Sequence, residues 1–183
     1  MHELTKSVTI TLSYLTVIGD ILTIAALLWF LFRRRFSLAV RQRWQNYFSR
    51  YGVAFAFGIA LIATLGSLFY SEVAGYTPCT LCWYQRIFMY PQVLLWGLAL
   101  VKREQVIADY GIALSIVGGF IAAYHYALQF VPKPTFCSAV GYSVSCTQDF
   151  FLQLGYITIP MMSLTAFLLI LLSAIILRQG SRS

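Results

Sequence analysis

Charged residues are scarce in this chain. Of its 183 residues, 10% are charged and 60% are hydrophobic, whereas an ordinary soluble domain has about 25% and about 45–50%. A chain of this length has too little interior to remove so much apolar surface from water. The composition therefore excludes a soluble globular protein and a disordered one, and it indicates that lipid is the solvent for much of the surface.

Histidines and acidic residues are also few. The chain has two histidines, His2 and His125, and six Asp and Glu, so a haem held by two histidines from neighbouring helices is not supported. No internal repeat and no low-complexity linker is visible. A net charge of +7 would suggest nucleic acid in a soluble chain, but in a membrane protein it reflects basic loops. We expect no nucleic-acid partner.

Long apolar stretches dominate what is present. A helix needs about 20 apolar residues to cross a bilayer core of about 30 Å, and in lipid a helix satisfies its own backbone hydrogen bonds. Five stretches fit: residues 7–32, 52–70, 84–101, 106–131 and 156–177. The first ends at Arg33, Arg34 and Arg35, which resemble a stop-transfer flank rather than a signal-peptide cleavage site. We therefore expect an all-α membrane protein with five transmembrane helices.

Basic residues predict the orientation. Six lie between the first and second stretches, two between the third and fourth, and two in the C-terminal tail, whereas the other side has Lys6 and Lys133. Because Lys and Arg collect on the cytoplasmic side, we expect the N-terminus outside and the C-terminus inside. Apolar and aromatic residues at helical spacing over 36–48 predict an amphipathic helix on the inner membrane face.

All four cysteines then fall on the outer side. Cys79 and Cys82 precede the third stretch, and Cys137 and Cys146 lie between the fourth and fifth. Two intervening residues at a helix start suit a redox dithiol, because the helix N-terminus stabilises one thiolate. Two structural disulfides or a four-thiolate zinc site are the alternatives. Zinc is least favoured because the second pair lacks the spacing of metal ligands. The cysteines alone favour a dithiol–disulfide relay and two structural disulfides about equally.

Arg86 favours the relay. It lies four residues after Cys82, hence on the same helix face and about 6 Å deeper. A charge inside a membrane is costly and is by default functional, and a guanidinium keeps its proton. Such a cation would lower the pKa of the Cys82 thiol and could donate hydrogen bonds to a carbonyl ligand. The alternative is an arginine that snorkels to the interface.

Two more polar residues lie within the apolar stretches. His125 lies near the outer end of the fourth, at a depth comparable with Arg86, and could move a proton or bond a ligand oxygen; alternatively it is hydrogen-bonded within the bundle. Asp20 belongs to a polar stripe on the first stretch, which we interpret as the face packed on the other helices. The stripe comprises Thr9, Ser13, Thr16, Asp20 and Thr23.

With these residues in view, the chain resembles the DsbB/BdbC family of membrane disulfide-bond formation proteins, and the BdbC branch more closely. The resemblance covers about residues 52–178. It rests on the run Pro-Cys-Thr-Leu-Cys-Trp-Tyr-Gln-Arg at 78–86, on His125 within 124–129, on Cys137 and Cys146, and on the segment 156–160. It implies a four-helix redox bundle over residues 51–183, to which residues 1–50 add an N-terminal transmembrane helix and a cytoplasmic connection.

The resemblance also implies an activity: a thiol:quinone oxidoreductase of the bacterial inner membrane that supports disulfide bond formation. Cys137 would form the mixed disulfide with an extracytoplasmic thioredoxin-like partner of the DsbA type. Exchange through Cys146 and Cys79 would pass electrons to the Cys79–Cys82 pair, and Cys82 would face a membrane quinone, ubiquinone or menaquinone. Arg86 and His125 are the expected quinone-binding residues, and no metal is expected.

Other interpretations remain open. Vitamin K epoxide reductase-like enzymes are also similar, but in them the loop cysteine pair precedes the CxxC, whereas here it follows. An enzyme that exports reducing equivalents would need cysteines on the cytoplasmic side. A small transporter or sensor would use the cysteines only as structural disulfides. Finally, Phe150, Phe151 and Leu154 at helical spacing predict a short surface helix over residues 147–154.

Overall fold

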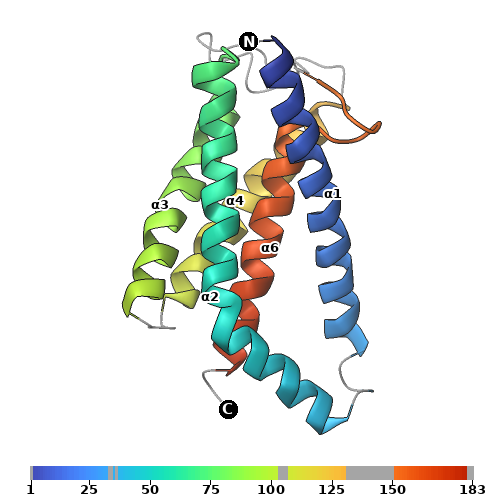
Figure 1. Ribbon diagram of the computed structural model, residues 1–183, viewed down its shortest axis with the longest axis vertical. Coiled ribbons are helices and arrows are strands. Elements are labelled where there is room, and N and C mark those ends of the chain that lie inside the picture. The colour runs from blue at the N-terminus through green and yellow to red at the C-terminus, as the bar shows by residue number, and fades with distance from the viewer. Residues whose placement is uncertain (1, 33–34, 36, 103–106, 131–150, 181–183) are drawn as a thin grey trace.

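The computed structural model shows a bundle of long helices that run alternately up and down (Figure 1). It describes residues 2–32, 35, 37–102, 107–130 and 151–180. The helices are α1 (His2–Phe32), α2 (Leu38–Leu68) with a π-helical turn η2 (Phe69–Val73), α3 (Thr80–Lys102), α4 (Ala108–Leu128) and α6 (Ile159–Gly180). The chain ends lie at opposite ends of the bundle (Figure 1). The expected all-α bundle with an additional N-terminal helix is confirmed.

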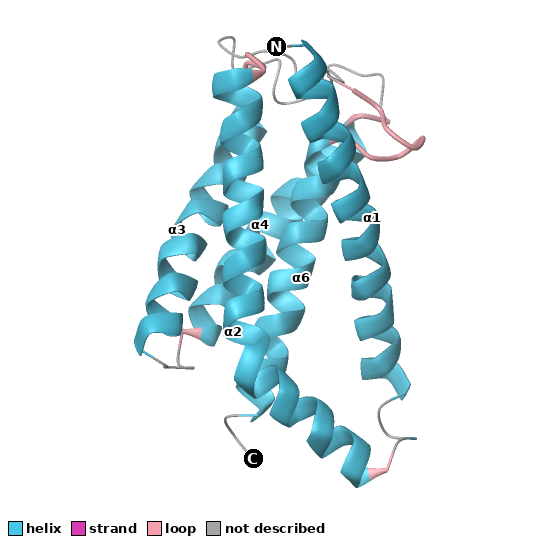
Figure 2. Ribbon diagram, in the orientation of Figure 1, coloured by secondary structure: helices cyan, strands magenta, loops and turns pink. Residues whose placement is uncertain are grey.

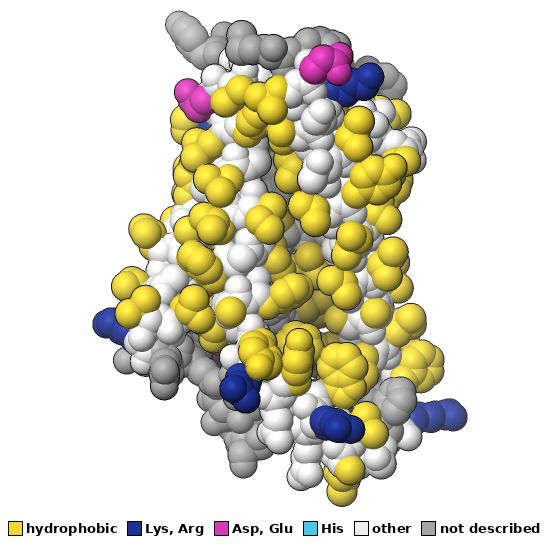
Figure 3. All heavy atoms as spheres, in the orientation of Figure 1, with side chains coloured by type: hydrophobic (Ala, Val, Ile, Leu, Met, Phe, Trp, Pro, Cys, Tyr) yellow, Lys and Arg dark blue, Asp and Glu magenta, His cyan; other side chains and the backbone are white. Residues whose placement is uncertain are grey.

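Four of the described helical segments are long and apolar enough to cross a membrane: Glu3–Phe32, Arg50–Val73, Ala108–Leu128 and Ile159–Gln179. The remaining helix, α3, has 23 residues and so reaches about 34 Å, but Gln85, Arg86 and Gln92 make it more polar. It packs beside α2 and α4 (Figure 2). Hydrophobic side chains cover most of the visible surface (Figure 3). The chain is a multi-pass membrane protein.

The first third of α2 differs from the expectation. The predicted amphipathic helix over residues 36–48 is not a separate element, because α2 begins at Leu38 and continues without a break into the second apolar stretch. Figure 1 shows α2 bending, so that its first part is inclined to the rest of the bundle. Trp44 packs on Trp29 near the end of α1, with ring centroids 6.2 Å apart. This contact connects the two helices at the end opposite the cysteines.

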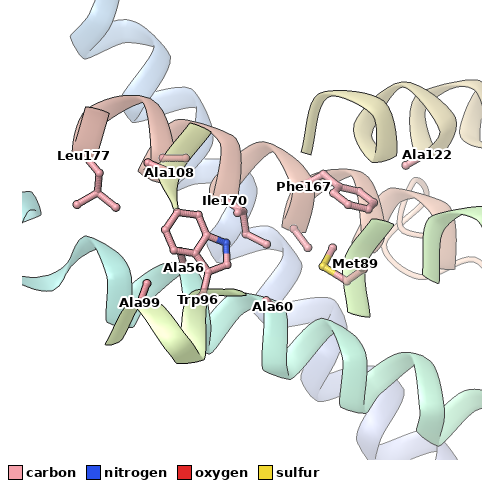
Figure 4. Packing of buried hydrophobic residues seen from close by; sticks show 12 residues of the cluster. Ala56, Ala60, Met89, Trp96, Ala99, Ala108, Ala122, Phe167, Ile170 and Leu177 are labelled. Atoms are coloured by element: carbon pink, nitrogen blue, oxygen red, sulfur yellow. The ribbon is translucent and has the colours of Figure 1, made fainter. Parts of the chain in front are cut away.

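The core lies among α2, α3, α4 and α6 (Figure 4), and two glycines of α4 make its closest contacts. Trp96 of α3 and Phe167 of α6 are 1% and 0% exposed. A Cβ atom at Gly111 would lie 2.4 Å from the Trp96 ring, and one at Gly118 would lie 2.3 Å from the Phe167 ring. Small residues at such positions allow membrane helices to approach closely. Gly111 and Gly118 therefore make room for the two rings.

The polar stripe of α1 faces the bundle, as predicted. Thr9, Ser13, Thr16 and Thr23 are all buried. Asp20 accepts hydrogen bonds from Thr165 Oγ1 at 2.6 Å and from Tyr156 Oη at 3.0 Å. Both donors belong to α6 or the segment just before it. The stripe thus attaches α1 to α6, and Asp20 has a packing role.

The segment before α6 does not follow its prediction. Residues 151–154 are not helical: Gln153 pairs with Ile157 across a tight reversal. Leu154 and Gly155 have φ angles of 52° and 79°, which lie in the left-handed region and turn the chain back. Phe151 packs on Tyr70 with ring centroids 5.5 Å apart. The predicted helix over 147–154 is wrong for these four residues, and residues 147–150 lie outside the described part.

Candidate functional site

The CxxC motif lies at the N-terminus of α3. The Trp83 N–H donates to the Cys79 carbonyl at 3.1 Å, which begins the helix. The Cys82 N–H donates to Cys79 Sγ at 3.4 Å, so the sulfur caps an amide that has no partner within the helix. The two sulfurs are free thiols 3.1 Å apart. A helix N-terminus favours negative charge, so this position suits a Cys79 thiolate.

His125 of α4 lies against Cys79. Its Nε2 atom is 3.7 Å from Cys79 Sγ. Gln85 Nε2 donates to His125 Nδ1 at 2.9 Å, so Nδ1 is the acceptor and the ring proton lies on Nε2, toward the sulfur. Gln85 and His125 are both buried. Gln85 therefore holds the histidine in the tautomer that donates to Cys79.

These contacts favour the ionised form of Cys79, which precedes the first residue of α3. Its pKa lies well below that of an ordinary thiol, chiefly because the Cys82 thiol donates a hydrogen bond to it. His125 lowers the pKa further by its hydrogen bond, while burial acts in the opposite direction. The sequence singled out Arg86 and Cys82 for this effect. In the structure the neighbours of Cys79 supply it.

Arg86 is directed at α2 rather than at the membrane interface. Its Nε and Nη2 atoms donate to Ser67 Oγ and to the Ser67 carbonyl, each at 3.0 Å. Tyr90 Oη also donates to Ser67 Oγ at 3.4 Å, and the guanidinium lies 5.3 Å from the centre of the Trp83 ring. Two hydrogen bonds to one residue fix the plane of the guanidinium. Ser67 and Tyr90 were not anticipated from the sequence.

A cavity of about 320 Å³ opens beside Cys82 and Arg86. Its walls come from α1, α2, α3 and α6, and most of its lining is apolar. Several polar side chains line it near the cysteines, namely Ser67, Tyr70, Cys82, Gln85 and Arg86, and Thr16, Ser163 and Thr165 line it as well. Cys79 and His125 are not among its lining residues. The two sulfurs therefore face different surroundings: Cys82 borders the cavity, and Cys79 contacts His125.

The two cysteines and His125 together offer a set of metal-binding ligand atoms. Ligand atoms of Cys79, Cys82 and His125 all lie within 4.8 Å of one another, and sulfur and imidazole suit a soft divalent ion. This set differs from the four-thiolate site considered from the sequence. Cys137 and Cys146 lie outside the described residues, so their predicted part in the site stays a prediction.

Comparison with known proteins agrees with this arrangement. The profile of the family described as disulfide bond formation protein DsbB matches residues 49–177. Probable disulfide formation protein C 1 of Bacillus cereus is 43% identical over 120 residues, which cover 66% of this chain and 86% of that protein. Disulfide bond formation protein C of Bacillus subtilis is 41% identical over 125 residues, covering 68% and 90%. No solved structure matches the chain significantly.

The family match includes every described residue of the site except those that α1 contributes to the cavity. Cys79, Cys82, Gln85, Arg86 and His125 all lie within residues 49–177. A dithiol at a helix start in a membrane bundle suits the chemistry that the names of the relatives describe. The chain therefore belongs to the DsbB family of disulfide bond formation proteins, which makes it a disulfide-forming membrane oxidoreductase.

Proposed function

We propose that this protein is a thiol:quinone oxidoreductase that reoxidises a thioredoxin-like, DsbA-type dithiol partner outside the cytoplasm. The observation that carries the proposal is the division of the CxxC pair between two surroundings. Cys82 borders an apolar cavity together with the permanent cation of Arg86, and Cys79 contacts His125. One sulfur thus suits an apolar electron acceptor, and the other suits thiol–disulfide exchange.

On the donor side, the proposal starts from a Cys79–Cys82 disulfide. A thiolate of the Cys137–Cys146 pair, reduced by the partner, attacks Cys79 Sγ and displaces Cys82 as a thiolate. The second thiolate of that pair then resolves the mixed disulfide and displaces Cys79. Exchange is faster when the leaving thiol has a low pKa. The helix N-terminus and His125 favour Cys79 as the second leaving thiolate, and the charge of Arg86 lies on the side of Cys82, the first to leave.

On the acceptor side, the cavity fits a membrane quinone. Its lining is largely apolar, and Arg86, Gln85 and Cys82 lie toward its cysteine end. When bound, a quinone supplies a strong two-electron oxidant. Arg86 would donate to a carbonyl oxygen at that end while its bonds to Ser67 hold it in place. The apolar walls would exclude water from the half-buried sulfur of Cys82.

The experiment is quinone reduction by the purified protein supplied with a reduced DsbA-type donor. We expect quinol to form at a rate that depends on both substrates, and we expect Cys79→Ser and Cys82→Ser to abolish it while the variants remain folded. If the folded wild-type protein forms no quinol with any membrane quinone, the proposal is wrong. If the wild-type protein does not reduce quinone and Cys79→Ser lowers its thermal stability, the cysteines form structural disulfides of a transporter or sensor.

A further inference from the structure

Helix α1 lies before the residues that the DsbB family profile matches, which begin at residue 49. It nevertheless forms one wall of the cavity that borders Cys82 and Arg86. Its contribution comprises Leu12, Leu15, Thr16, Ile18, Gly19 and Leu22. The face of the molecule between α1 and α2 is hollowed, with hydrophobic side chains in the recess (Figure 3). The cavity is therefore completed by a helix outside the matched region.

The position of α1 is set by specific contacts at two levels. Near the cysteine end, Tyr70 Oη donates to Thr9 Oγ1 at 3.3 Å. Further along, Asp20 accepts the hydrogen bonds from Thr165 and Tyr156. Beside Asp20, a Cβ atom on Gly19 would lie 2.8 Å from the Thr165 side chain, so the helices approach closely there. From Leu12, between these levels, to Leu22, just beyond the second, α1 lines the cavity.

The wall that α1 contributes extends over about three turns of the helix, from Leu12 to Leu22. Leu12 packs near Gly66 of α2, because a Cβ atom added to Gly66 would lie 3.2 Å from the Leu12 side chain. Ser67 follows Gly66 and holds Arg86, so Leu12 lies at the cysteine end. Leu22 is ten residues further on, or about 15 Å along the helix. The α1 wall thus leads away from the cation and the thiol, and its side chains are apolar except for Thr16.

We propose that α1 forms the binding wall for the isoprenoid tail of the quinone, and that it makes the site selective for a long tail. The inference rests on the proposed function, because it needs a quinone ring beside Cys82 and Arg86. An apolar chain attached to a polar ring matches a cavity with this polarity. The head group is then selected by residues within the family match, and the tail by a helix outside it.

The test compares two neighbouring positions of α1. Leu22 lines the cavity and is 45% exposed, whereas Ile21 does not line it and is 60% exposed. In Leu22→Trp the larger side chain fills the path of the tail, so the Michaelis constant for a quinone with several isoprene units should rise by about tenfold. The constant for a quinone without an isoprenoid tail should stay within about twofold. Ile21→Trp, the matched control, should change neither constant.

A binding measurement on the wild-type protein, without a thiol donor, makes the test independent of turnover. A quinone with a photoreactive group at the end of its tail should crosslink to the α1 peptide that contains Leu22, and an excess of unlabelled long-tailed quinone should prevent this. The inference is overturned if Leu22→Trp leaves the long-tailed constant unchanged, or if the label attaches only to other helices. If the wild-type protein reduces no quinone at all, the proposed function fails instead.

Discussion

At the scale of single residues, Cys79 and His125 form the contact on which the donor side depends. His125→Ala removes a hydrogen bond that lowers the Cys79 pKa. We expect the thiolate of the reduced variant to take up its proton at a higher pH than in the wild type. The thiolate absorbance, followed during an acid titration, measures this shift. His125→Gln, which keeps a donor, should lie between the two, and an unchanged titration would argue against the contact.

The same contact predicts how pH affects the reduced protein. Because the folded state favours the Cys79 anion, its folded pKa is below its unfolded pKa. The stabilisation is fully present above the pKa of the unfolded thiol and is lost as the pH falls through the folded pKa. The reduced protein should therefore lose stability relative to the oxidised protein on acidification. Thermal unfolding of both forms across a pH series measures the difference, and parallel curves would contradict it.

Arg86 offers a second residue-scale prediction. Arg86→Ala removes the cation beside Cys82 and the two bonds to Ser67. We expect the Michaelis constant for quinone to rise by at least about tenfold, with a smaller effect on thermal unfolding. Arg86→Lys keeps the charge but not the two-point hold on Ser67, and it should be intermediate. An unchanged constant and rate in Arg86→Ala would show that Arg86 only anchors the helix.

The sequence indicated the reactive residues but not their partners. Cysteine spacing and a charge one helical turn away single out Cys79, Cys82 and Arg86 without tertiary information. Ser67 and Gln85 carry no such pattern, because a serine or glutamine in an apolar stretch has many ordinary roles. Their importance depends on which helices are neighbours. His125 was expected near the outer end of its helix, but only the packing of α4 on α3 shows that it contacts the Cys79 sulfur rather than lines the cavity.

At the scale of helices, the close packing of α4 on α6 can be tested with two adjacent glycines. A Cβ atom at Gly118 would lie 2.3 Å from the Phe167 ring, whereas at Gly119 the nearest atom is 3.7 Å away. Gly118→Ala should therefore destabilise the bundle by about 1–3 kcal/mol. Gly119→Ala, the matched control, should be neutral or slightly stabilising, because alanine favours helix. Reversible unfolding in detergent measures both, and equal effects would contradict the packing.

The helical elements were largely predictable because lipid leaves few alternatives. The exceptions have physical causes. Residues 36–48 have an amphipathic pattern, but that pattern does not show whether the helix ends before the next apolar stretch, and here α2 continues through it. At 151–154 the aromatic spacing predicted a helix, but Leu154 and Gly155 adopt left-handed backbone conformations. A local turn of this kind overrides a pattern only a few residues long.

At the scale of the whole molecule, the path of α3 decides the topology. Four described segments have the composition of membrane spans, and α3 is more polar. If α3 also crosses, the termini lie on opposite sides of the membrane, as their places at opposite ends of the bundle indicate (Figure 1). Tags at the two ends of the chain should then differ in protease accessibility. In sealed vesicles with the same orientation as the cell, added protease should reach the N-terminal tag and not the C-terminal one. Equal accessibility of both tags would contradict this.

The central claim is that the Cys79–Cys82 dithiol itself delivers two electrons to a quinone beside it. The most direct measurement mixes the prereduced Cys137→Ser/Cys146→Ser variant with a membrane quinone in the absence of any thiol donor. The account predicts one equivalent of quinol per protein and a new Cys79–Cys82 disulfide, identified by mass spectrometry of the unreduced protein. A folded, reduced variant that forms neither the quinol nor this disulfide would contradict it.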